Sequence, residues 1–157
     1  MLEILLFGRD AKGVQHEPDV VSEAIQIWLH SPYSHSAIRA NGVIYEANWP
    51  VVRKLAGQDA VAYGNAAVAH CVIPATDEQI AKGIAWAETT LGDHYSLAGL
   101  FGFIADLHLE MPHEYICSSY CASFLGHSGV RIYDDPMLET PKSLAEEWGV
   151  VELAGVA

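Results

Sequence analysis

The chain has 157 residues, of which 51% are hydrophobic, and its 20 acidic and 8 basic residues give a formal net charge of -12. This length fits a single domain, residues 1–157, with a sizeable core. The acidic balance argues against nucleic acid and anionic membranes as primary partners, because both carry negative charge. A soluble surface is the simplest explanation of the charge.

The first expected element is a buried strand over residues 2–7. It is not a signal peptide, because it lacks a basic start and contains Glu3. The longest apolar stretch, residues 96–109, is too short and too polar for a membrane span. Three scattered cysteines are too few for a disulfide framework, so we expect free thiols in a reducing compartment and a cytoplasmic protein.

An amphipathic helix is predicted next, over residues 19–30, and Pro32 stops it. Two short strands follow, over residues 35–40 and 43–47. The Asn-Gly pair between them is a strong signal for a two-residue hairpin turn.

Further strands and helices are expected in the second half of the chain. Residues 66–73 form a strand pattern, and Thr76 with Gln79 forms a capping box for a helix that ends at Gly92. The remaining expected elements are a helical segment at 95–109, a helix at 117–126 ending near Gly126 or Gly129, a strand at 130–133, a short helix capped by Thr140 with Pro141 at its first position, and a strand at 150–155. Strands and helices that do not alternate strictly favour an α+β fold with an antiparallel sheet.

The hairpin places several polar side chains on one face. Its tight turn pairs Ile38 with Tyr45, and side chains alternate between faces along each strand. His35, Glu46 and Asn48 therefore point to the same side. Either Glu46 or Asn48 is able to accept a hydrogen bond from the imidazole, which would fix its tautomer and favour the imidazolium form.

Cys117 is expected at the N-terminus of a helix. The unpaired N–H groups and the helix dipole there favour a thiolate, the nucleophilic form of cysteine. A thiolate beside an oriented histidine performs acyl transfer, and the N–H groups of Cys117 and its neighbours, such as Ser118, would stabilise an oxyanion. However, a cysteine at a helix start is more often a small buried hydrophobe. The spacing alone does not bring His35 and Cys117 together.

Four segments resemble one family of enzymes. These are "IQIWLHSPYSHSAIRANGVIYEA", "LGDHYSLAGLFGF", "YICSSYCASFLGHSGV" and "ETPKSLAEE", in that order. They resemble the permuted NlpC-type group of circularly permuted papain-like proteins, which includes YiiX-like bacterial proteins and relatives of lecithin:retinol acyltransferase. In this group the histidine strand precedes the cysteine helix, as it does here.

The resemblance implies a circularly permuted papain-like fold, with an antiparallel sheet packed against helices and the catalytic cysteine at a helix N-terminus. It implies Cys117 as nucleophile, His35 as general base and Glu46 as the third residue, with Asn48 as the alternative. The expected activity is that of a thiol hydrolase or acyltransferase without a cofactor. Its substrate would be a peptide, an isopeptide, a peptidoglycan fragment or a lipid ester. The alternative is a non-catalytic binding module that keeps the fold and the cleft.

Other polar residues are weaker candidates for the site. Three tyrosines would line it or donate to an oxyanion, although ordinary packing also explains them: Tyr33, Tyr95 and Tyr115. A metal site would need His108 and His113 with Cys121. Their spacing matches no zinc pattern, so no metal is expected.

Overall fold

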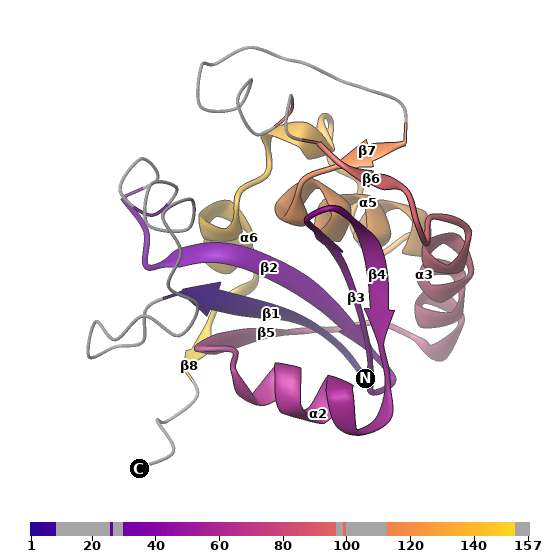
Figure 1. Ribbon diagram of the computed structural model, residues 1–157, viewed down its shortest axis with the longest axis horizontal. Helices are drawn as coiled ribbons and strands as arrows, with labels where there is room; N and C mark the ends of the chain where they lie inside the picture. The colour runs from indigo at the N-terminus through magenta and orange to yellow at the C-terminus, as the bar shows by residue number, and fades with distance from the viewer. Residues whose placement is uncertain (9–25, 27–29, 97–98, 100–112, 153–157) are drawn as a thin grey trace.

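The computed structural model describes residues 1–8, 26, 30–96, 99 and 113–152, which form an α+β fold around one twisted sheet (Figure 1). The strands are β1 (Leu2–Gly8), β2 (Tyr33–Ala40), β3 (Val43–Asn48), β4 (Val51–Leu55), β5 (Ala69–Ile73), β6 (His94–Tyr95), β7 (Glu114–Tyr115) and β8 (Val151–Glu152). The helices are α2 (Gly57–Asn65), α3 (Asp77–Thr89), α5 (Cys117–Ser128) and α6 (Pro141–Trp148), with a short 3₁₀ turn at Pro136–Leu138. None of these described helices is both long and apolar enough to cross a membrane.

The eight strands lie in the order β7-β6-β4-β3-β2-β1-β5-β8. Every neighbouring pair is antiparallel except β6 and β7, which are parallel. All seven residues of β1 are buried, because β2 and β5 flank it and helices cover both of its faces. The antiparallel sheet predicted from the sequence is therefore confirmed.

Alternate residues of β1 enter two separate cores. Ile4 and Leu6 join the large core beneath α3, α5 and α6, whereas Leu5 and Phe7 join a smaller core beneath α2. This two-sided burial explains why the strand is apolar at nearly every position. In Figure 1, α2 lies on one side of the sheet, and α3 and α5 lie on the other.

The hairpin of β2 and β3 has the predicted register, with Ile38 opposite Tyr45. Asn41 and Gly42 both have positive φ, 50° and 83°, as a two-residue turn of this type requires. The pairing of β2 with β3 extends from the turn to Ile38. Farther along, β3 continues to pair with β4.

Most of the expected helices are confirmed. Thr76 and Gln79 form the predicted capping box at the start of α3. The helix α5 ends at Ser128, and Gly129 follows it with a φ of 71°. Thr140 caps α6, and Pro141 is its first residue.

Other expectations need correction. Residues 130–133 are not a strand, because the N–H groups of Val130 and Arg131 bind Leu125 O and complete the end of α5. The strand expected over 66–73 begins only at Ala69, since the N–H groups of the two residues after Asn65 bind carbonyls of α2.

Three elements were not predicted, and two predicted helices lie mostly outside the described residues. The sequence did not predict β4, α2 or β7. Residues 94–95 form the short strand β6 at the start of the segment expected to be helical over 95–109. Most of that segment, and most of the predicted helix over 19–30, lie outside the described residues.

Candidate active site

Cys117 is the first residue of α5, and the residue is 6% exposed. The turn before it is fixed by Ser119, whose Oγ accepts a hydrogen bond from the Ile116 N–H at 3.0 Å. The Cys117 sulfur accepts hydrogen bonds from the backbone N–H groups of Ser36 and Ser118. The helix start thus surrounds the sulfur with donors that favour its thiolate form.

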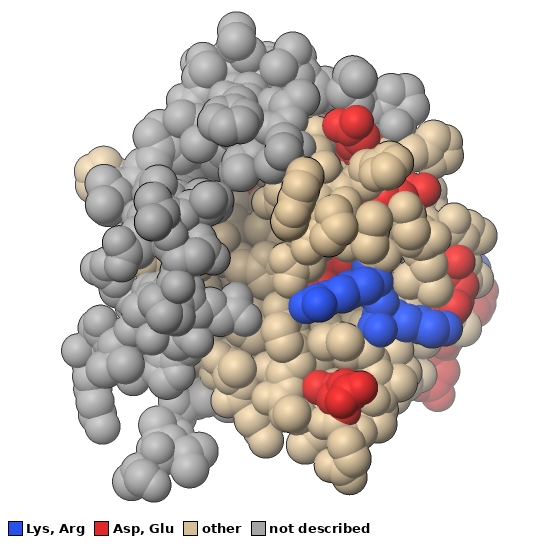
Figure 2. All heavy atoms as spheres, viewed as in Figure 1, with Lys and Arg blue, Asp and Glu red and all other residues tan. Residues whose placement is uncertain are grey.

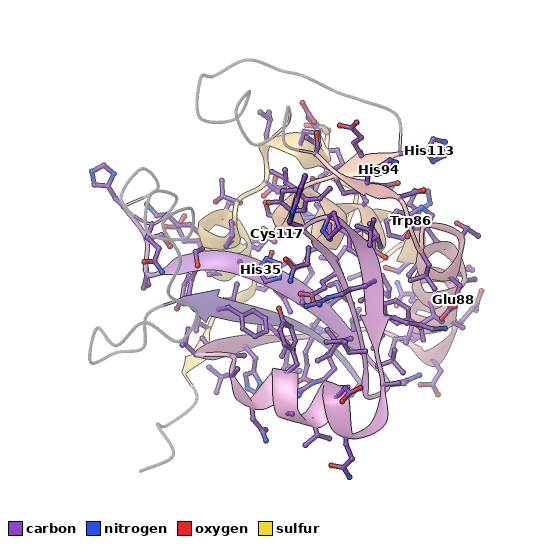
Figure 3. All side chains as sticks on the ribbon, in the orientation of Figure 1. His35, Trp86, Glu88, His94, His113 and Cys117 are labelled. Atoms are coloured by element: carbon purple, nitrogen blue, oxygen red, sulfur yellow. The ribbon has the colours of Figure 1, made fainter. Side chains whose placement is uncertain are left out.

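His35 lies on β2 and faces Cys117 across the start of α5 (Figure 3). Its Nε2 is 2.7 Å from Oε2 of Glu46. The remaining ring nitrogen, Nδ1, is therefore the one available for the hydrogen bond that joins His35 to Cys117. The imidazole packs beside the Phe7 ring, with 5.5 Å between ring centroids, and its side chain is 12% exposed.

The cysteine and the histidine shift each other's pKa. Burial opposes the charged form of both groups. The charge of each partner and the hydrogen bond between them outweigh burial, so the pKa of Cys117 is lowered and the pKa of His35 is raised. Both shifts favour a thiolate beside an imidazolium.

Glu46 is a fully buried carboxylate that holds the far side of His35. Burial alone would raise its pKa, but hydrogen bonds from His35 and Tyr63 and the charges of His35 and Arg53 lower the pKa to about 2. Of the two acceptors left open by the sequence, Glu46 makes the contact. Asn48 lies at the end of β3, opposite Val51 of β4.

Two residues around Glu46 were missed by the sequence analysis. Arg53 of β4 lies opposite Glu46 in the ladder, and its Nε and Nη2 are 2.7 and 2.6 Å from Oε1. Tyr63 of α2 donates its hydroxyl to Oε2 at 2.7 Å. The strand formers Val51 and Val52 after the turn at Trp49-Pro50 were a usable signal for β4, and they would have placed Arg53 beside Glu46.

The weaker candidates have different surroundings. Ser118 supplies its backbone N–H to Cys117, while its hydroxyl donates to Glu139 O. Tyr115 packs edge-on against Trp86, with ring centroids 5.9 Å apart. This contact fits ordinary packing, the alternative to a role in lining the site. Tyr95 lies beside Tyr115 in the parallel pairing of β6 with β7.

Tyr33 borders a cavity of about 240 Å³ near α6. The other lining residues are His30, Ser31, Pro32, Lys142, Ala145, Glu146 and Val150. The lining does not include Cys117, His35 or Glu46, so this cavity is distinct from the site that those three residues form.

The residues weighed for a metal site do not converge. His113 is 81% exposed and its Nδ1 lies 3.4 Å from Asp93, whereas Cys121 is buried with its Sγ 3.5 Å from Ser36 Oγ. His108 lies outside the described residues. Within the described part of the chain, no group of three His, Cys, Asp or Glu residues is arranged to hold a metal ion.

All three cysteines are unpaired, as the sequence predicted, but only one is activated. Burial raises the pKa of Cys71 to about 11 and raises the pKa of Cys121 further. Cys117 has the opposite shift because His35 and two N–H donors act on it.

Comparisons with models of protein families and with curated proteins find no match to this chain. The contacts among Cys117, His35 and Glu46 are therefore the basis for assigning a function.

Proposed function

We propose that this protein is a cysteine-dependent hydrolase or acyltransferase that cleaves an amide or ester bond. One observation carries the proposal. Cys117, at the N-terminus of α5, is hydrogen-bonded to His35, and the other ring nitrogen of His35 is 2.7 Å from the buried Glu46 carboxylate. This is the arrangement of nucleophile, base and orienting group that covalent acyl transfer needs.

The chemistry follows from the protonation states. The Cys117 thiolate attacks the substrate carbonyl carbon, and the carbonyl oxygen becomes an oxyanion near the N–H groups at the helix start. The His35 imidazolium gives its proton to the leaving amine or alcohol as the bond to the carbonyl carbon breaks. The neutral imidazole then takes a proton from water or an amine, which attacks the thioester and releases Cys117.

The chain order supports a permuted papain-like member of this class. The histidine strand precedes the cysteine helix, and the four resembling segments have the same order as in that group. The substrate class proposed on this basis is a peptide, an isopeptide, a peptidoglycan fragment or a lipid ester. Unpaired cysteines support action in a reducing compartment such as the cytoplasm.

The test is to trap the acyl-enzyme. Incubation with p-nitrophenyl acetate, an activated ester, is expected to acetylate Cys117 with a burst of nitrophenolate. Mass spectrometry of peptides from quenched samples locates the acetyl group. Cys117→Ser and His35→Ala should abolish the burst, while the control Cys71→Ala, which removes a buried thiol of β5, should retain it.

Two results would contradict the proposal. One is an acetyl group spread over several nucleophiles with no dependence on Cys117. The other is a folded protein that forms no acyl-enzyme at all. The second result would favour the binding module, which has no need of an activated thiol.

A further inference from the structure

We infer that Arg53 and Tyr63 are positioning residues for the proposed reaction, which together hold the Glu46 carboxylate in the one orientation that keeps His35 facing Cys117. The inference rests on the proposed function for its catalytic meaning. The geometry behind it is independent of any substrate.

The Glu46 carboxylate accepts from four donor atoms. Its Oε2 accepts from His35 Nε2 and from the Tyr63 hydroxyl, both at 2.7 Å. Its Oε1 accepts from two nitrogens of Arg53, at 2.7 and 2.6 Å. A carboxylate offers about four lone-pair positions, so these four contacts occupy it fully and fix its rotation.

The donors to Glu46 come from three different elements. Glu46 comes from β3, His35 from β2, Arg53 from β4 and Tyr63 from α2. Beyond Ile38 the ladder between β2 and β3 has ended, so backbone pairing does not fix His35 relative to Glu46 there. The side chains of the neighbouring strand and helix supply that constraint.

Charge also links these residues. Cys117, His35, Glu46 and Arg53 form a row of alternating negative and positive groups. A buried carboxylate with a histidine as its sole partner would compete for the shared proton. The guanidinium of Arg53 stabilises the anionic form of Glu46, so the Nε2 proton stays on His35. The ring then carries its second proton on Nδ1, which faces Cys117 and the leaving group.

Arg53 also packs over the Tyr63 ring, with its central carbon 5.6 Å from the ring centroid. This contact links the two positioning residues to each other. The neighbouring Lys54 is different, because it pairs with Glu88, an exposed carboxylate outside the site. Figure 2 shows basic side chains over β4, where Arg53 and Lys54 are the basic residues, so the strand offers its own matched control.

The experiment compares Arg53→Ala, Arg53→Lys, Tyr63→Phe and the control Lys54→Ala. Both alanine variants remove one positive charge, but only Arg53→Ala removes a partner of Glu46. On acidification, the rate of Cys117 alkylation by iodoacetamide falls as the thiolate is protonated; this fall is the acid limb of the pH profile. In Arg53→Ala the acid limb should move to higher pH by about one unit, the size typical of losing a nearby charge. Arg53→Lys should restore most of that limb, and Lys54→Ala should leave it unchanged.

A second readout does not depend on thiol reactivity. The Nε2–H proton of His35, which lies in the hydrogen bond to Glu46, should give a downfield NMR resonance in the wild type and in Lys54→Ala. It should broaden in Arg53→Ala and in Tyr63→Phe. In the acetylation assay both variants should lower the rate by about tenfold, which is the lower end of the range for outer partners of active-site groups.

The outcomes separate the two proposals. An unreactive Cys117 together with a broadened His35 resonance in the variants would overturn the proposed function and support the positioning inference. An unchanged resonance and an unchanged acid limb in folded Arg53→Ala and Tyr63→Phe would overturn the inference, even with a reactive Cys117.

Discussion

Each of the three reactive-site residues depends on a neighbour for its charge. The pKa of Cys117 is lowered because His35 and backbone N–H groups face it, and the pKa of His35 is raised because Cys117 and Glu46 face it. Burial opposes all three charges, so no member of the group keeps its state alone. Changes to one residue should therefore appear in the titration of another.

The first prediction concerns cysteine reactivity. Among the three thiols, only Cys117 should be alkylated quickly by iodoacetamide at mildly acidic pH, because its pKa is lowered while burial raises the pKa of Cys71 and Cys121. His35→Ala should slow this reaction near pH 6. Mass-spectrometric mapping of the adducts across pH measures both effects.

A matched control for that variant is His70→Ala. His70 is also a partly buried strand histidine, but it lies on β5 and contacts Glu3. It should leave the alkylation of Cys117 unchanged. Equal labelling of all three cysteines would mean that no activated thiol exists.

The second prediction concerns acid stability. Because the pKa of Glu46 falls from 4.5 to about 2 on folding, its contribution is fully present above pH 4.5 and is lost as the pH falls toward 2. The full contribution corresponds to about 3 kcal/mol. Urea unfolding of wild type and Glu46→Gln should differ most near neutral pH, and the difference should shrink steadily below pH 4.5. A difference independent of pH would contradict the linkage.

At the scale of elements, the position of Cys117 depends on how α5 packs. Phe124 of α5 is fully buried against α3, where Gly83 leaves room for its ring. A Cβ at Gly83 would lie 2.4 Å from Phe124 Cε1, which is closer than such atoms approach in proteins. The glycine therefore permits the close contact of the two helices.

The third prediction compares two glycines in helices. Gly83→Ala should destabilise the protein by about 1 to 3 kcal/mol through overpacking, despite the better helix propensity of alanine. Gly126→Ala should instead stabilise by up to about 1 kcal/mol, because its Cβ would meet only Arg131 O at 3.8 Å. Thermal or urea unfolding measures both, and a stabilising Gly83→Ala would show that α3 is free to move away from α5.

At the scale of the whole molecule, a buried ion pair ties the central strands together. Glu3 of β1 is almost fully buried, and its Oε2 accepts from Arg39 Nε of β2 at 2.7 Å. Its other oxygen lies 3.2 Å from His70 of β5. Three adjacent strands thus share one carboxylate on the face covered by α2.

The fourth prediction tests this pair. Arg39→Leu should destabilise the protein by about 2 to 3 kcal/mol, less than for a fully buried pair because Arg39 is 25% exposed. The double variant Glu3→Leu/Arg39→Leu should recover most of the loss, since it leaves no unpaired buried charge. Urea unfolding of the single and double variants measures the coupling energy between Glu3 and Arg39. If the changes in the free energy of unfolding simply add, the two residues are not coupled and the prediction is wrong.

The amino-acid sequence determined the local parts of this protein. Its strand alternation and its Asn-Gly turn specified the hairpin register, and thereby the common face of His35 and Glu46. Its capping residues specified the starts of α3 and α6. These features are predictable because hydrogen bonds between residues close in the chain create them.

Only the tertiary structure decided which residues from distant segments meet. It brought Cys117 to His35, 82 positions earlier in the chain, and it chose Glu46 over Asn48 as the acceptor. It also added Arg53 and Tyr63, from β4 and α2, two elements that were not predicted from the sequence. The physical reason is that the order of strands and the packing of α5 and α2 on opposite faces depend on burial summed over the whole chain, which no local pattern records.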